Sequence, residues 1–109
     1  MLNLKDTINL MTSADYKERF MAEYHQLETR YLKLRDMCEK LDKELILDFE
    51  PTCPREWYNR QMYFMLGYLE SLINKAKVEQ VKLDIEPSVL VDVDNFVRID
   101  AHTQNIIKS

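Results

Sequence analysis

Hydrophobic residues recur at alternating steps of four and three along two long stretches of the chain. The first series is Phe20, Tyr24, Leu27, Tyr31, Leu34, Cys38, Leu41 and Leu45. The second is Tyr58, Met62, Met65, Leu69, Leu72 and Ala76. This is the a/d spacing of helices that pack along one face. The pattern predicts helices over about residues 13–47 and 53–79.

The residues between the two stretches predict how the helices are joined. Pro51 disfavours helical backbone at the residue before it. Thr12 or Ser13 is the expected N-cap of the first helix, and Thr52 or Cys53 that of the second, with Pro54 in its first turn. A short connection between long helices favours antiparallel neighbours. The expected core of the fold is therefore an antiparallel two-helix hairpin.

The second helix carries more apolar surface than one neighbour can cover. Residues 62–66 read Met-Tyr-Phe-Met-Leu, and a helix that is apolar on every side is buried on every side. A chain of 109 residues that forms two long helices has little interior of its own. We expect the missing cover to come from another copy, in a helical-bundle homo-oligomer, or from a ligand. Gly67, which is unfavourable inside a helix, predicts close approach of a neighbouring backbone or a ligand there.

The last third of the chain changes its pattern. Val89-Leu90-Val91-Asp92-Val93 and Phe96-Val97-Arg98-Ile99 flank Asp94-Asn95, which favours a small β-hairpin. We expect a mainly α protein with one domain, in which residues 1–80 form the helical hairpin with an N-terminal arm. Residues 81–109 would form the β-hairpin appendage and a frayed tail.

Charge and cysteine content restrict the partners and the compartment. The formal net charge is −4, which argues against a duplex DNA binder, yet residues 51–77 hold four Lys or Arg and two Asp or Glu. The second helix is therefore the place to look for an anionic ligand. Cys38 and Cys53 would lie too far apart for a disulfide, so we expect free thiols in the cytoplasm. The sequence has no stretch that predicts a membrane span or a signal peptide.

Chemistry-bearing motifs are missing from the sequence. It contains no Gly-rich phosphate loop, no paired-cysteine metal spacing and no nucleophile elbow. His25 is expected to be a partly exposed helical residue, and Asp92–Asn95 lacks the Gly and Glu of a calcium loop. We therefore expect no catalytic residues, no metal site, no cofactor and no enzymatic activity.

The second helix opens with a cluster of aromatic and basic residues. At 100° per residue, one side of it carries Trp57, Arg60, Phe64, Gly67, Tyr68 and Ser71. Aromatic rings stack on nucleobases, and guanidinium groups bind phosphate oxygens. The candidate phosphate ligands are Lys17, Arg55 and Arg60, and the candidate stacking residues are Trp57, Tyr63 and Tyr68. The same residue types are also enriched in protein–protein interfaces, and an aromatic stripe is more often packing than a ligand site.

The region from Tyr16 to Leu83 resembles a family of small phage and prophage proteins related to a crAss-like phage protein. The resemblance rests on Tyr16-Lys17-Glu18-Arg19, the loop Phe49-Glu50-Pro51-Thr52-Cys53-Pro54, Gln61-Met62, Met65 and Tyr68-Leu69. In size and architecture the chain is also similar to phage counter-defence sponges, which are small helical-hairpin oligomers. These bind cyclic nucleotide or ADP-ribose-type immune signals without cleaving them.

Together these features lead to two hypotheses about function. The first is a phage-encoded, non-enzymatic protein that sequesters a nucleotide-derived immune signal between subunits in the host bacterial cytoplasm. The alternative is a protein-interaction module that binds and inhibits a host defence protein, or serves phage assembly, without a small-molecule ligand.

Overall fold

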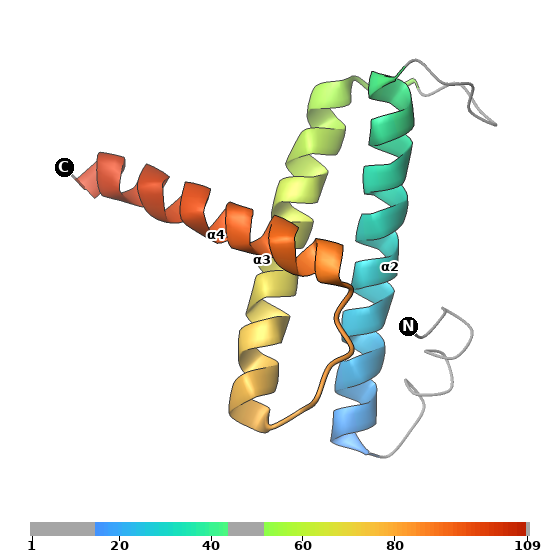
Figure 1. The fold of residues 1–109 in the computed structure, drawn as a ribbon, viewed down its shortest axis with the longest axis vertical. Helices are drawn as coiled ribbons and strands as arrows, with labels where there is room; N and C mark the ends of the chain where they lie inside the picture. The colour runs from blue at the N-terminus through green and yellow to red at the C-terminus, as the bar shows by residue number, and fades with distance from the viewer. Residues whose placement is uncertain (1–14, 44–51, 109) are drawn as a thin grey trace.

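Three helices make up the described part of the chain. The computed structural model describes residues 15–43 and 52–108, the last eight of these as backbone only. Helix α2 spans Tyr16–Asp42, α3 spans Arg55–Glu79 and α4 spans Pro87–Lys108. Helices α2 and α3 lie side by side and antiparallel, and α4 crosses α3 and projects beyond the hairpin (Figure 1). The predicted mainly α hairpin is confirmed, while the N-terminal arm and Leu45 lie outside the described residues.

The predicted a/d positions form the contact between α2 and α3. The buried members of the series are Phe20, Tyr24, Tyr31 and Cys38 on α2 and Leu69, Leu72 and Ala76 on α3. Leu27, Leu34 and Leu41 are only half-buried, because two helices cannot surround each other. Full burial of a large apolar side chain contributes roughly 1.5–3 kcal/mol. The hairpin is therefore held along one line of side chains, and its remaining faces depend on other contacts.

The helix ends differ in detail from those predicted. Asp15 caps α2, its side chain accepting the Lys17 N–H at 2.9 Å, in place of Thr12 or Ser13, which lie outside the described residues. Helix α3 follows Pro54 at its N-cap, with no side-chain cap from Thr52 or Cys53. It ends at Gln80, which has left-handed backbone angles (φ 58°). The left-handed residue turns the chain back toward α2.

The prediction of a C-terminal β-hairpin is wrong, because residues 87–108 form α4, and no strand occurs among the described residues. Val89, Val93 and Phe96 are spaced four and three apart, so helical backbone places them on one face. Val89 and Val93 are buried there, whereas alternate strand positions would divide such a set between two faces. Pro87 suits the first turn of a helix, and Asp94-Asn95 lacks the Gly that favours a tight hairpin turn.

Gly67 marks the place where α4 crosses α3. A Cβ atom added to Gly67 would lie 3.3 Å from the Cζ atom of Phe96, closer than ordinary van der Waals contact. A close approach is therefore present at this glycine, but it is made by an aromatic side chain of the same chain and not by the backbone or ligand that we expected. Helix α4 thus supplies part of the cover that residues 62–66 require. Phe64 remains 65% exposed, so the cover is incomplete in a single copy.

A sealed polar cluster lies beneath the connection from α3 to α4. The carboxylate of Glu28, fully buried, accepts the Tyr24 hydroxyl at 2.7 Å and the backbone N–H of Glu86 at 3.2 Å. Glu86 accepts the first hydrogen bonds of α4, so Glu28 ties the start of α4 to α2. His25 is also buried, which corrects the expectation of a partly exposed residue. Burial lowers the pKa of His25, although the Glu28 carboxylate opposes that shift.

Candidate functional site

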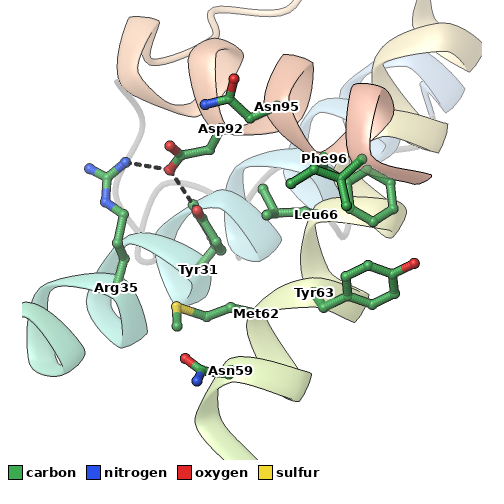
Figure 2. A pocket seen from close by; sticks show the side chains of 10 residues that line it. Tyr31, Arg35, Asn59, Met62, Tyr63, Leu66, Asp92, Asn95 and Phe96 are labelled. Carbon is green, nitrogen blue, oxygen red and sulfur yellow. Dashed lines mark hydrogen bonds and ion pairs between the residues drawn. The ribbon is translucent and has the colours of Figure 1, made fainter. Parts of the chain in front are cut away.

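A groove of about 390 Å³ lies in the corner between α3 and α4, with α2 as its floor. Most of the lining is apolar or aromatic, and a few polar groups converge on it (Figure 2). Its walls are formed by Tyr31 and Arg35 of α2, Asn59, Met62, Tyr63 and Leu66 of α3, and Asp92, Asn95, Phe96 and Ile99 of α4. This combination of apolar walls and few polar groups is typical of a small-molecule site.

Three charged or polar side chains form a network at the inner end of the groove. The Tyr31 hydroxyl donates to Asp92 Oδ2 at 2.6 Å, and Arg35 Nη1 donates to the same oxygen at 2.9 Å (Figure 2). Arg35 Nη2 also donates to Ser88 Oγ at 3.1 Å. Burial, followed by the hydrogen bond to Asp92, raises the pKa of Tyr31, so its hydroxyl remains a donor. The network joins α2 to α4 and fixes one side of the groove.

A second hollow of about 440 Å³ adjoins the groove and shares Asn59 and Tyr63 with it. Its other lining residues are Glu56, Arg60 and Phe64. The Arg60 guanidinium lies 5.0 Å from the centre of the exposed Trp57 ring. Within the described residues, Arg60 has no ion pair with a carboxylate. This hollow therefore presents the Arg60 guanidinium and the Glu56 carboxylate beside aromatic rings, without an ion pair between the two charges.

The structure brings together only part of the predicted ligand site. Arg60 and Tyr63 line the second hollow, and Trp57 stacks on Arg60. Tyr63 also donates to Asp100 Oδ1 at 3.1 Å, and its ring lies edge-on to the ring of Phe96. These three predicted residues therefore lie in one region at the start of α3.

The other three predicted residues line neither the groove nor the second hollow. Arg55 forms an ion pair with Asp42, with Nε and Oδ1 3.0 Å apart, and also hydrogen-bonds to Asn59. The Tyr68 hydroxyl hydrogen-bonds to Glu23 of α2. Lys17 lies in the first turn of α2, at the opposite end of the antiparallel hairpin from the start of α3 (Figure 1). Since α2 has 27 residues, about 40 Å of helix separates its two ends.

Sequence reasoning missed Tyr31, Arg35 and Asp92 as site residues. Asp92 lies 61 residues from Tyr31 and 57 from Arg35 in the sequence, so no local spacing predicts the network. One signal was present, since a tyrosine at an a/d position needs a partner for its hydroxyl. The observed partner is Asp92, which becomes available only because residues 87–108 are helical.

Residues 15–43 and 52–108 hold neither a candidate metal site nor a membrane-spanning helix. No group of three or more His, Cys, Asp or Glu side chains in that part of the chain could hold a metal ion. No described helix is long and apolar enough to cross a membrane. Cys38 is buried, Cys53 is exposed, and both are free thiols, as predicted.

The fold and the groove define a small helical-hairpin protein with an exposed aromatic surface. The family model described as Sequestin matches residues 14–77, which include all of α2 and nearly all of α3. The chain belongs to the Sequestin family. Comparison with the curated proteins and with the solved structures finds no match.

Proposed function

We propose that this protein is a phage-encoded, non-enzymatic binder that sequesters a nucleotide-derived immune signal of its bacterial host. The family name Sequestin suggests a sequestering protein, and the matched region includes α3, which carries Arg60 and Tyr63. A sequestering protein needs a site that holds its ligand without reacting with it. The groove and the adjoining hollow provide apolar walls, aromatic rings and few polar groups, which fits that requirement.

The observation that carries this proposal is the Arg60 guanidinium, which forms no ion pair within the described part of the chain, although Glu56 lines the same hollow. It lies in a hollow walled by Tyr63 and Phe64, which are 44% and 65% exposed. Exposed aromatic rings beside a guanidinium that forms no ion pair match the flat bases and the phosphates of a nucleotide. Arg60 would bind a phosphate, and Tyr63 would pack against a base.

A homo-oligomer would account for the predicted residues that a single copy keeps apart. Lys17 and Tyr68 reach no part of the groove in their own chain, but the same residues of a second copy can complete its open side. Arg55 is paired with Asp42, so it would have to exchange that carboxylate for a phosphate of the signal. Each copy would then contribute part of the wall around the signal, in the host cytoplasm.

Native mass spectrometry tests this proposal directly. The full chain, purified gently from cells with an active defence system, should form an oligomer that retains a few hundred daltons of added mass per site. Titration calorimetry with cyclic dinucleotides, a cyclic trinucleotide and cyclic ADP-ribose isomers should then identify the class of signal. Binding should weaken at least about tenfold in Arg60→Ala, since a charge-assisted contact is lost.

Arg30→Ala is the matched control, because Arg30 is an exposed arginine of α2 that lines neither hollow. Its affinity for the same nucleotides should equal that of the unaltered chain. Absence of retained mass together with absence of binding to every member of the panel would refute the proposal.

A second candidate function is favoured by the exposed aromatic residues of α3. Trp57, Phe64 and Tyr68 are 55%, 65% and 47% exposed and follow one side of the helix. Such a surface is typical of a protein–protein contact. On this alternative the chain binds and inhibits a host protein, or serves phage assembly. A stoichiometric host partner, captured by the unaltered chain and lost on both Trp57→Ala and Phe64→Ala, without any nucleotide binding, would favour it.

A further inference from the structure

The carboxylate of Asp92 is held at the inner end of the groove by two donors that share one of its oxygens. The Tyr31 hydroxyl and the Arg35 guanidinium both donate to Oδ2. No hydrogen bond within the described residues reaches Oδ1. The Asp92 side chain is 29% exposed and lines the groove. A carboxylate fixed in this way retains an acceptor oxygen for a bound molecule.

The charge of this network shows what the inner groove can accept. Arg35 is already neutralised by Asp92 and also donates to Ser88, so it offers no free charge for a phosphate. An entering anion would meet the Asp92 carboxylate and would have to compete with it for Arg35. A molecule with a hydrogen-bond donor would meet no such competitor. The inner groove therefore favours a neutral group with an N–H or O–H.

The walls on either side of Asp92 fit a flat ring. Met62 and Leu66 of α3 and Phe96 of α4 are the apolar side chains of the inner groove, and Asn95 lies one helical turn from Asp92. A volume of about 390 Å³ lies within the range of small-ligand sites. The second hollow, which contains Arg60, adjoins the groove at Asn59 and Tyr63, which line both. A ring in the groove and a phosphate at Arg60 can thus belong to one molecule.

We infer that Asp92 accepts a hydrogen bond from the exocyclic amino group of a nucleobase held in the groove, while Arg60 binds the phosphate of the same nucleotide. This rests on the proposed function and adds the orientation and base class of its ligand. Tyr31 and Arg35 act as positioning residues, because they hold Asp92 and do not themselves contact the base. The site selects amino-bearing bases because a buried acceptor left without a donor costs binding.

The test compares adenosine 5′-monophosphate with inosine 5′-monophosphate, which carries an oxygen where adenine has its amino group. Binding to the full-length chain is followed by ¹H–¹⁵N NMR titration, which detects weak complexes. The unaltered protein should bind the adenosine nucleotide about tenfold more tightly, as one charge-assisted hydrogen bond allows. Arg60→Ala should weaken binding of both nucleotides and leave their ratio unchanged.

Asp92→Asn should reverse the preference. Arg35 requires an acceptor, so the amide oxygen would turn to it and the amide N–H₂ would face the base, which favours the inosine oxygen. Tyr31→Phe leaves the Asp92 carboxylate in place and should keep the adenosine preference. Asp94→Asn is the matched control, since it removes the same charge from an exposed position of α4. Circular dichroism spectra and melting curves establish that each variant is folded.

Three results would overturn the inference. Equal binding of the two nucleotides by the unaltered chain would refute only the role of Asp92. The proposed function would still stand. An unchanged ratio in folded Asp92→Asn would do the same. A third result is equal affinity for the adenosine and inosine nucleotides together with loss of binding to 2′-deoxyadenosine 5′-monophosphate. This result would assign the donor to the ribose hydroxyl. If neither nucleotide binds the unaltered chain, the proposed function loses its support as well.

Discussion

Two tyrosine–carboxylate pairs, one heptad apart on α2, serve different purposes in this protein. Tyr24 donates to Glu28 of its own helix, and Tyr31 donates to Asp92 of α4. Tyr24 and Glu28 are fully buried beneath the connection to α4, whereas Asp92 is 29% exposed in the groove. The two pairs share their chemistry and differ in access to solvent. Access therefore separates a polar contact that holds the fold from one that can meet a ligand.

Removal of the sealed carboxylate should have the largest effect. Glu28→Ala would leave the Tyr24 hydroxyl and the Glu86 N–H buried without an acceptor, and would leave a cavity. The expected loss is about 3–5 kcal/mol of unfolding free energy, measured by urea denaturation. Glu28→Gln retains an acceptor oxygen and should lose less. A loss in Glu28→Ala no larger than in Glu28→Gln would show that these buried hydrogen bonds contribute little.

Acidification should weaken the sealed cluster without removing any atom. Burial lowers the pKa of His25 in the folded state, so the unfolded chain binds a proton more readily. Stability should therefore be full above the unfolded pKa of about 6.5 and decline as the pH falls below it. Urea midpoints at pH 7.5 and 5.5 measure this decline. His25→Gln should reduce it.

Loss of a hydrogen-bonding group should cost less stability in the Tyr31–Asp92 pair than in the buried Tyr24–Glu28 pair. Tyr31→Phe removes one hydroxyl from a network in which Arg35 still holds Asp92. A net cost of about 1 kcal/mol is expected, seen as a small shift of the urea midpoint. Tyr24→Phe is the comparison at the sealed site and should cost more, because it leaves Glu28 fully buried with one fewer donor. Equal costs would show that access to solvent does not distinguish the two pairs.

Substitution of the exposed Trp57 at the start of α3 should affect stability least. Trp57 is 55% exposed and contacts the Arg60 guanidinium. Trp57→Ala should change the unfolding free energy by less than about 0.5 kcal/mol, as surface substitutions usually do. If the proposed function holds, the same variant should weaken nucleotide binding severalfold, because Arg60 loses its stacking partner. A strong loss of stability would instead assign Trp57 to the core.

The hairpin could be predicted because its signals are local and repeat many times. Phe20, Tyr24 and Tyr31 on α2 and Leu69 on α3 follow the a/d spacing and are buried as expected. Helix α4 was missed because β-branched residues dominate residues 89–93, and such residues favour a strand. Burial of Val89 against the hairpin decides between them, and that contact is tertiary.

The site residues also divide into those that the sequence predicts and those that only the fold brings together. Arg60 and Tyr63 stand out from the sequence, because both belong to a conspicuous aromatic and basic cluster at the start of α3. Arg35 does not stand out, since it is one of several charged residues on α2 that a helix would normally present to water. Only the position of α4 gives it Asp92 and Ser88 as partners. Long-range pairs of this kind need the fold before they can be identified.

The crossing of α4 over α3 has a consequence for motion. The groove has walls on three helices, so it exists only while α4 lies across Gly67. Any molecule held between Phe96 and Met62 would oppose release of α4, by the same free energy with which a docked α4 favours that molecule. Amide hydrogen exchange along α4 would therefore slow in proportion to occupancy. Helix α4 would thus report whether the groove is occupied.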